Sequence, residues 1–228
     1  MELRTAAILP VAGLSSRMGF FKPLATLSGY PMIRLTMQAA LDAGVDEVVV
    51  VCGKNSDAVH LALKSADDAW DSAPSQMPQH RVHFVYNSAF ASNEMLDSVK
   101  LGLGKLLELE QAGARLDAAF VIPGDIPAVN PQTYSKLIAH QQETGAPVCI
   151  PSRKGITGHP VLFTREVFDL VLAYTGPGGL RGAITPLVSS YLETDDKGVT
   201  LDADTFEDFQ QLQAYLEHIS ANPSSIIH

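Results

Sequence analysis

A short loop near the N-terminus combines glycine with two cations. The first apolar run, residues 5–9, leads into the loop 10–22, which contains Gly13, Ser15, Arg17 and Lys22. Glycine-rich turns between a strand and a helix expose backbone N–H groups that bind phosphate. Arg17 adds a planar fork for phosphate oxygens and Lys22 a point charge. The loop suits a polyphosphate, although a surface turn with two solvated cations has the same composition.

Spacing excludes several common motifs. Gly13 is not followed by Gly-Lys-Ser/Thr, so the loop is not a P-loop, and Gly19 lies too far from Gly13 for the dinucleotide fingerprint. The chain has no Gly-x-Ser-x-Gly elbow, no zinc-spaced His/Cys cluster and no reactive-cysteine context. Any chemistry therefore uses no obvious protein nucleophile.

An acidic loop follows a later apolar run. Residues 117–123 lead into Gly124-Asp125-Ile126-Pro127. Ligands of parallel sheets bind at the carboxyl ends of the strands, and a carboxylate beside phosphates is a hard ligand for Mg²⁺. An Asx-turn is the plain alternative for Asp125. Two loops after buried strands, one cationic and one acidic, predict a shared site.

Near the C-terminus, the segment 202–208 has two interpretations. Thr205 with Asp208 forms a capping box, which leaves Asp204 free to coordinate a metal. Asp204 with Glu207 is the other capping box, and Asp204 is then the N-cap. Asp202 is the weaker metal-ligand candidate.

Two further segments carry polar residues that can contact a substrate. Ser98 follows an Asn-containing segment after the third predicted strand. Two interpretations are open for it: a residue that contacts the base or ribose, and an ordinary helix residue. His159 stands between Gly158 and Pro160 and is presented rigidly. A lone histidine is either structural or in contact with substrate, and both roles remain open.

Alternating strands and helices position these loops. The expected strands are apolar on both faces and suit a parallel sheet: residues 5–9, 46–53, 81–86 and 117–123. The expected helices between them are residues 31–43, 95–110 and 131–143. The pattern predicts an α/β fold of right-handed βαβ units. Beyond Gly145 we expect strands at 147–151 and 158–163, helices at 165–174, 180–190 and 205–220, and a surface loop over 65–80.

Composition bounds the class of protein. The chain has 228 residues, of which 46% are hydrophobic, and a net charge of −9. The acidic balance argues against binding to nucleic acid or acidic membranes. Neither a signal peptide nor a membrane span is evident, and Cys52 and Cys149 suggest buried thiols rather than a disulfide framework, so we expect a cytoplasmic protein. One domain over 1–221 and a flexible tail over 222–228 are expected.

The segment 9–33 resembles the signature of the MobA-like NTP transferases, nucleotidyltransferases with a GT-A-like, Rossmann-type fold, and Gly29 and Pro31 match its Gly-x-Pro. Their pattern L-A-A-G-x-S-x-R-M-G-x-x-K is in register with Gly13, Ser15, Arg17, Met18, Gly19 and Lys22. Gly124-Asp125-Ile126-Pro127 is similar to the family's G-D-M-P. The segment 158–163, Gly-His-Pro-Val-Leu-Phe, resembles the molybdenum cofactor cytidylyltransferase branch, and 202–208 resembles D-I-D-T-P-E-D.

The resemblance implies a three-layer α/β/α fold with a mostly parallel mixed sheet, and transfer of NMP from an NTP to a phosphorylated acceptor such as the molybdopterin cofactor. The implied nucleotide-binding residues are Val11, Ala12, Gly13, Leu14, Ser15, Arg17, Lys22, Ser98 and Gly124. It assigns Mg²⁺ to Asp125 and Asp204, catalysis to Arg17, Lys22 and Asp125, and the acceptor to His159 and Arg181. The acceptor phosphate is itself the nucleophile, so catalysis is positioning and charge neutralisation.

The sequence departs from the family pattern at Pro10, Val11, Glu94, Pro177 and Phe206. The first two alter the segment that meets the base: Ala12 before Gly13 favours CTP, whereas a double glycine accompanies GTP. A sugar phosphate or alcohol phosphate is the alternative acceptor. The alternative to an enzyme is a regulatory module that binds a nucleotide without catalysis. Retention of Arg17, Lys22 and Asp125 argues against this alternative.

Overall fold

The computed structural model describes residues 3–13, 20–70, 81–91 and 94–221. The helices in this part are α1 (Met32–Asp42), α2 (Ser56–Trp70), α3 (Met95–Gln111), α4 (Pro131–Thr144), α5 (Val167–Ala173), α6 (Gly179–Ile184), α7 (Phe206–Ala221) and the 3-10 turns η1 (Lys22–Leu24) and η2 (Lys197–Thr200). The strands are β1 (Thr5–Val11), β2 (Thr26–Leu27), β3 (Tyr30–Pro31), β4 (Glu47–Cys52), β5 (Arg81–Tyr86), β6 (Ala118–Val121), β7 (Val148–Arg153), β8 (Ile156–Thr157), β9 (Val161–Thr164) and β10 (Ser189–Glu193).

The main sheet has the strand order β10-β7-β9-β6-β1-β4-β5, with β8 paired to β7. Strands β6, β1, β4 and β5 run parallel. The buried apolar sequences of β1, β4 and β6 predict this, whereas β5 at the sheet edge is only partly buried. Strand β9 is antiparallel to both β6 and β7 and reverses the chain direction in the middle of the sheet. The sheet is therefore mixed but mostly parallel.

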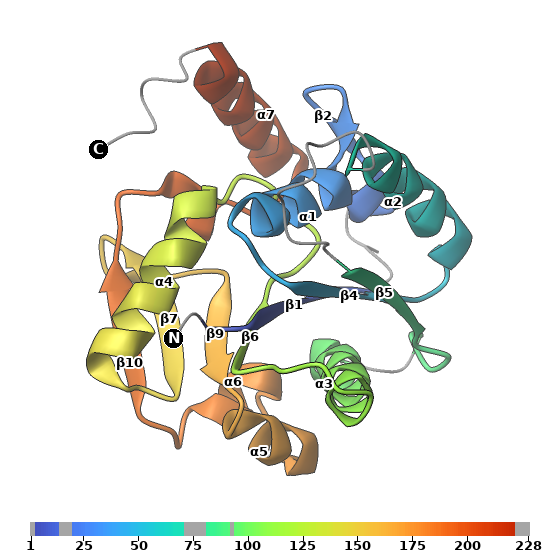
Figure 1. The fold of residues 1–228 in the computed structure, drawn as a ribbon. Coiled ribbons are helices and arrows are strands. Elements are labelled where there is room, and N and C mark those ends of the chain that lie inside the picture. The colour runs from blue at the N-terminus through green and yellow to red at the C-terminus, as the bar shows by residue number, and fades with distance from the viewer. Residues whose placement is uncertain (1–2, 14–19, 71–80, 92–93, 222–228) are drawn as a thin grey trace.

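Helices cover both faces of this sheet (Figure 1). One core joins α1, α2 and α4 to side chains such as Leu9, Val50 and Phe120, and the other joins α3, α5 and α6 to Ile8, Val49 and Phe163. A smaller cluster packs α7 onto Leu27 and Met32. The predicted Rossmann-like three-layer α/β/α fold is confirmed.

Two predicted elements are wrong. Residues 65–70 belong to α2 and not to a loop, because the polar stretch there continues an amphipathic helix that begins at Ser56. Residues 180–190 are not one helix: α6 ends at Ile184, and β10 begins at Ser189 and pairs in parallel with β7. The remainder of the predicted loop, 71–80, and the predicted tail, 222–228, lie outside the described residues. No helix in the described part of the chain has the length and apolar composition that a membrane span requires.

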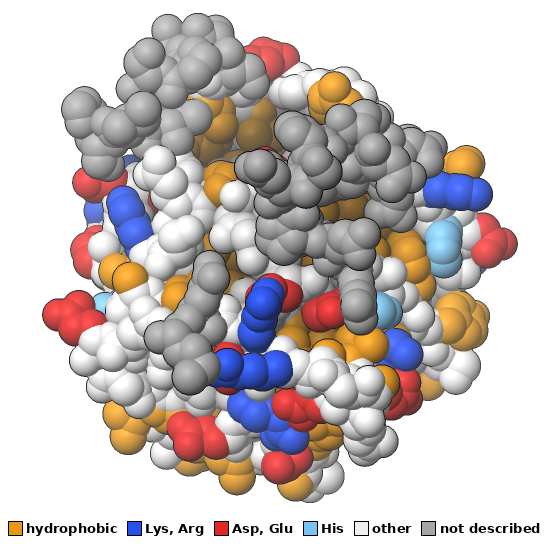
Figure 2. Space-filling view, viewed as in Figure 1, with side chains coloured by type: hydrophobic (Ala, Val, Ile, Leu, Met, Phe, Trp, Pro, Cys, Tyr) orange, Lys and Arg blue, Asp and Glu red, His pale blue; other side chains and the backbone are white. Residues whose placement is uncertain are grey.

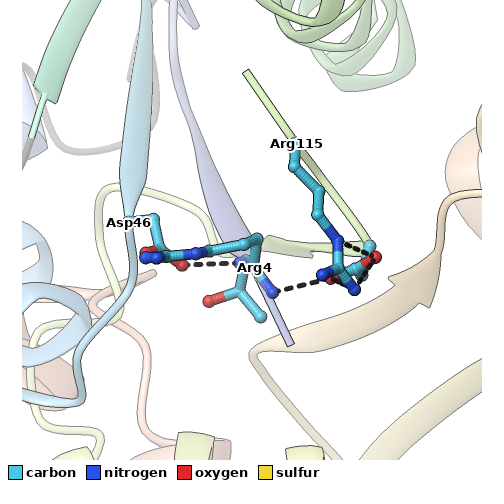
Figure 3. Close-up of polar contacts among 5 residues, drawn as sticks. Arg4, Asp46 and Arg115 are labelled. Atoms are coloured by element: carbon cyan, nitrogen blue, oxygen red, sulfur yellow. Dashed lines mark hydrogen bonds and ion pairs between the residues drawn. The ribbon is translucent and has the colours of Figure 1, made fainter. Parts of the chain in front are cut away.

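Two aspartates fix the start of β1 between its neighbours. Asp46, just before β4, accepts from the Thr5 N–H at 2.8 Å and pairs with the Arg4 guanidinium. Asp117, just before β6, accepts from the Arg4 N–H at 2.8 Å and is also bound by Arg115. Figure 3 shows Arg4 between Asp46 and Arg115, and Figure 2 shows positive and negative side chains together near the centre of the face in view. The pairs set the register of the three central strands.

Replacing Asp46 with alanine removes the hydrogen-bond acceptor of the buried Thr5 N–H. We expect the free energy of unfolding to fall by about 1–3 kcal/mol, the usual effect of leaving a buried donor unpaired. Chemical denaturation measures it. The control, Asp169→Ala, removes an exposed carboxylate 3.7 Å from Arg165 and should change stability by less than about 0.5 kcal/mol. Equal losses in both variants would contradict this role of Asp46.

Candidate functional site

Two glycines allow the loops at the carboxyl edge of the sheet to meet. A Cβ atom on Gly124 would lie 2.3 Å from Val11 Cγ1, so only glycine lets the loop after β6 lie against the end of β1. A Cβ atom on Gly53 would lie 2.6 Å from the Ala12 carbonyl oxygen, so the loop after β4 is held equally close. The ends of three parallel strands therefore converge beside Asp125, as expected for a ligand site in such a sheet.

Lys22 lies at the centre of this edge. Its ammonium is 2.6 Å from Asp204 Oδ1 and 3.5 Å from Asp125 Oδ2. The lysine is 6% exposed, because η1 packs it beneath the carboxylates, whereas the Asp204 side chain is 48% exposed. The structure thus brings together three residues that the sequence assigned to one site.

The start of α7 resolves the two interpretations of Asp204. The Thr205 hydroxyl accepts from the Asp208 N–H at 3.1 Å, and the Asp208 carboxylate accepts from the Thr205 N–H at 2.9 Å. This reciprocal pair is the capping box in which Thr205 is the N-cap. Asp204 therefore does not cap the helix, and its carboxylate faces Lys22.

Negative charge accumulates around this lysine. Burial raises the pKa of Asp202, and the carboxylates of Asp204, Asp125 and Asp208 raise it further, while Lys22 acts in the opposite direction. These carboxylates are close enough to interact through their charges, so the edge carries a negative potential that attracts cations.

The carboxylate oxygens of Asp125 and Asp204 fit a hard divalent cation that takes its remaining ligands from water or from phosphate. Asp125 and Asp204 are held close to one another by a cation, the Lys22 ammonium, and both offer oxygen ligands. Within the described ranges, no group of three or more His, Cys, Asp or Glu side chains is placed to hold a metal ion. Mg²⁺ is usually held by one or two carboxylates together with water and substrate phosphates. The two carboxylates of Asp125 and Asp204 match that number of protein ligands.

The remaining loop residues divide into two groups. Val11 and Ala12 are buried and Gly13 is exposed, so the side chains of the first two point into the protein. Their predicted contact with a nucleotide would therefore be made by the backbone. Leu14, Ser15 and Arg17 lie outside the described residues, and their assigned roles stay predictions.

Ser98 supports a turn. The buried Asn87 side chain donates to the Ser98 hydroxyl at 3.2 Å and accepts from the Ala89 N–H at 3.0 Å. The hydroxyl therefore holds the segment that leaves β5, and its own exposed fraction is 3%. Its predicted contact with the nucleotide remains untested.

The two predicted acceptor residues line one groove of about 590 Å³. We call it the β9–α6 groove, lined by His159, Arg181, Ile150, Tyr191, Met95 and Leu180 among others. Arg181 is exposed on α6, whereas His159 is held by η2, where its N–H donates to the Val199 carbonyl at 2.8 Å. The groove combines a cation with apolar and aromatic walls.

His159 lines this groove and is also close enough to Asp125 for the charge of that carboxylate to act on its imidazole. Burial lowers the pKa of the imidazole, and a hydrogen bond to the Val121 carbonyl and the charge of Asp125 oppose that effect. Tyr191 is a groove residue that the sequence did not identify, because no strand is predicted over 189–193, and residues 189–190 are expected to end a helix. The sequence of β10, Ser-Ser-Tyr-Leu-Glu, has no apolar–polar alternation that would indicate a strand.

Comparison with known proteins agrees with this arrangement. The model of the MobA-like NTP transferase domain family matches residues 7–193. A 2-C-methyl-D-erythritol 4-phosphate cytidylyltransferase from Chlorobaculum parvum is 26% identical over 157 residues, which are 67% of this chain and 58% of that protein. The bifunctional protein GlmU from Geobacter metallireducens is 28% identical over 153 residues, which are 64% of this chain and 26% of that protein. The matched region spans less than two thirds of either relative.

Among solved structures, a nucleotidyl transferase from Methanothermobacter has a TM-score of 0.74 at 22% identity, covering 94% of this chain and 98% of that one. This likeness shows a shared fold over nearly the whole chain. The family model covers the cationic loop, the acidic loop and the β9–α6 groove, and it ends within β10. The chain belongs to the family of MobA-like NTP transferase domains, which are nucleotidyltransferases.

Proposed function

We propose that this protein transfers a cytidylyl group from CTP to a small phosphorylated acceptor and releases pyrophosphate, with Mg²⁺ held by Asp125 and Asp204. The observation that carries the proposal is the cluster of Lys22, Asp125 and Asp204 at the carboxyl edge of the sheet. A cation beside two carboxylates is the charge pattern that a metal–polyphosphate complex requires.

The chain's own residues act by position and charge. The backbone after β1 approaches the phosphates, and Lys22 supplies a buried positive charge for the oxygens of the α-phosphate and of the leaving pyrophosphate. Bound Mg²⁺ supplies further charge neutralisation on the phosphate oxygens. Arg181 binds the acceptor phosphate, which is already an anionic nucleophile and needs no catalytic base.

The acceptor we favour is the phosphorylated molybdopterin cofactor. The segment 158–163 carries the motif of that branch, and it forms part of the β9–α6 groove. The aromatic Tyr191 and the side chains of Met95 and Ile150 give that groove apolar area for a ring system. Similarity to a cytidylyltransferase of 2-C-methyl-D-erythritol 4-phosphate supports an alcohol phosphate as the second candidate. CTP is the donor in both proposals.

Removing either charge at the centre of the site should abolish most of the turnover. We expect Lys22→Ala and Asp125→Ala each to lower kcat by about 10²–10³, because each group stabilises charge in the transition state. Pyrophosphate release under saturating Mg²⁺ measures this, with circular dichroism to confirm that the fold survives. Asp42→Ala, an exposed carboxylate on α1, is the matched control and should retain full turnover. Near-normal turnover of either site variant would refute the role of that residue.

The choice of base follows from the segment that ends β1. We expect CTP to give at least about tenfold higher kcat/KM than ATP, GTP or UTP, a difference of about 1.4 kcal/mol in transition-state binding. Pyrophosphate release is measured with each NTP and with both acceptor types. Equal rates with a purine nucleotide would contradict the preference. Tight nucleotide binding without release for any pair would favour the non-catalytic module.

Arg181 should affect the acceptor and not the nucleotide. We expect Arg181→Ala to raise the KM for the acceptor about tenfold, because a charge-assisted hydrogen bond to its phosphate is lost, with the KM for CTP unchanged. Steady-state kinetics with each substrate varied in turn separates the two. Arg34→Ala, which removes an arginine stacked on Tyr30, is the control for loss of a positive charge. A rise confined to the KM for CTP would show that Arg181 binds the nucleotide and would contradict its role toward the acceptor.

A further inference from the structure

The position of the Lys22 ammonium affects how a metal ion can bind to Asp125 and Asp204. The ammonium lies 2.6 Å from Asp204 and 3.5 Å from Asp125, so it occupies the space between the two carboxylates. Mg²⁺ approaches its oxygen ligands to about 2.1 Å. A divalent ion bound to both carboxylates would lie against a positive charge that is 8% exposed and has little room to withdraw into solvent. Lysine and metal are therefore two like charges that draw on the same pair of carboxylates, and each weakens the hold of the other.

The protein offers few other ligands. In the described part of the chain no third His, Cys, Asp or Glu side chain completes a metal site with these two. A metal ion that arrives alone thus meets two carboxylates whose charge is already partly neutralised by lysine. A nucleotide changes this balance, because its phosphates supply oxygen ligands for the metal and a new anionic partner for the ammonium.

We propose that Lys22 competes with the divalent metal for Asp125 and Asp204, so that metal and NTP bind cooperatively. This inference rests on the proposed function, since it uses the same metal ligands. Without nucleotide, the lysine neutralises the two carboxylates and keeps them together. When the triphosphate binds, the ammonium moves to its oxygens and the carboxylates become available. By linkage, the metal must strengthen nucleotide binding by the same factor.

The distinguishing result is a gain in metal affinity when a residue of the site is removed. In the full chain without nucleotide, we expect Lys22→Met to bind Mn²⁺ at least about tenfold more tightly than the unmodified protein, because a competing charge at contact distance is gone. Titration calorimetry or the electron paramagnetic resonance signal of free Mn²⁺ reports this directly. Lys105→Met removes one positive charge on α3, where Lys105 pairs with Glu108, and should change the affinity by less than about twofold.

A second measurement tests the cooperativity. A non-hydrolysable CTP analogue should strengthen Mn²⁺ binding more in the unmodified protein than in Lys22→Met, where the competitor is absent. Lys22→Gln, which keeps a polar group beside the carboxylates, replaces Lys22→Met if circular dichroism shows that the methionine variant is unfolded. Metal affinity in the folded variant equal to or below that of the unmodified protein would overturn the competition.

The double variant Lys22→Met/Asp125→Ala separates this inference from the proposed function. Loss of the gained affinity supports both the metal ligand and the competition. Tight Mn²⁺ binding that persists without the Asp125 carboxylate would overturn the metal assignment of the proposed function, and the competition with it. An Asp125-dependent metal site with no gain in Lys22→Met would overturn the competition alone.

Discussion

The contact between Lys22 and the carboxylates of Asp125 and Asp204 joins segments that are far apart in the sequence. Burying an ammonium is favourable only when opposite charge surrounds it, so η1, the loop after β6 and the start of α7 must be in place together. Apolar packing of α7 on Leu27 and Met32 brings Asp204 to the sheet edge. The docking of α7 and the charge balance around Lys22 therefore depend on each other. The capping box at Thr205 contributes, because it leaves the Asp204 carboxylate to pair with Lys22.

The parts of the fold that sequence predicted well are those in which local pattern and burial agree. Strands β1, β4 and β6 have no exposed face, and their continuous apolar runs identified them. Strand β10 lies at the sheet edge, and its sequence, Ser-Ser-Tyr-Leu-Glu, has no apolar–polar alternation. Its first residues were therefore predicted as the end of a helix over 180–190, whereas α6 ends at Ile184. The first half of α2 was not assigned, since its polar residues do not distinguish a surface helix from a loop.

The site was predicted to a similar extent and for a similar reason. Lys22 and Asp125 follow buried strands, and topology alone places such residues at one edge. The ion pair of Lys22 with Asp204 depends on tertiary docking across most of the chain, which no local pattern contains. The choice between Thr205 and Asp204 as helix cap was open in the sequence because both give a valid capping box. The structure decides it through the reciprocal hydrogen bonds between Thr205 and Asp208.

The reversed direction of β9 has a consequence for how the carboxylate cluster and the β9–α6 groove are arranged. In a wholly parallel sheet every residue at the carboxyl edge comes from a chain leaving a strand. Because β9 runs the other way, His159 reaches that edge just before the chain enters the strand, close enough for the charge of Asp125 to act on it. The sheet is thereby divided at one strand into a parallel half that carries the loops of Lys22 and Asp125 and a second half, β7 and β10, that carries walls of the groove. Insertions or substitutions beyond β9 can reshape the groove while the register of β1, β4 and β6 stays intact.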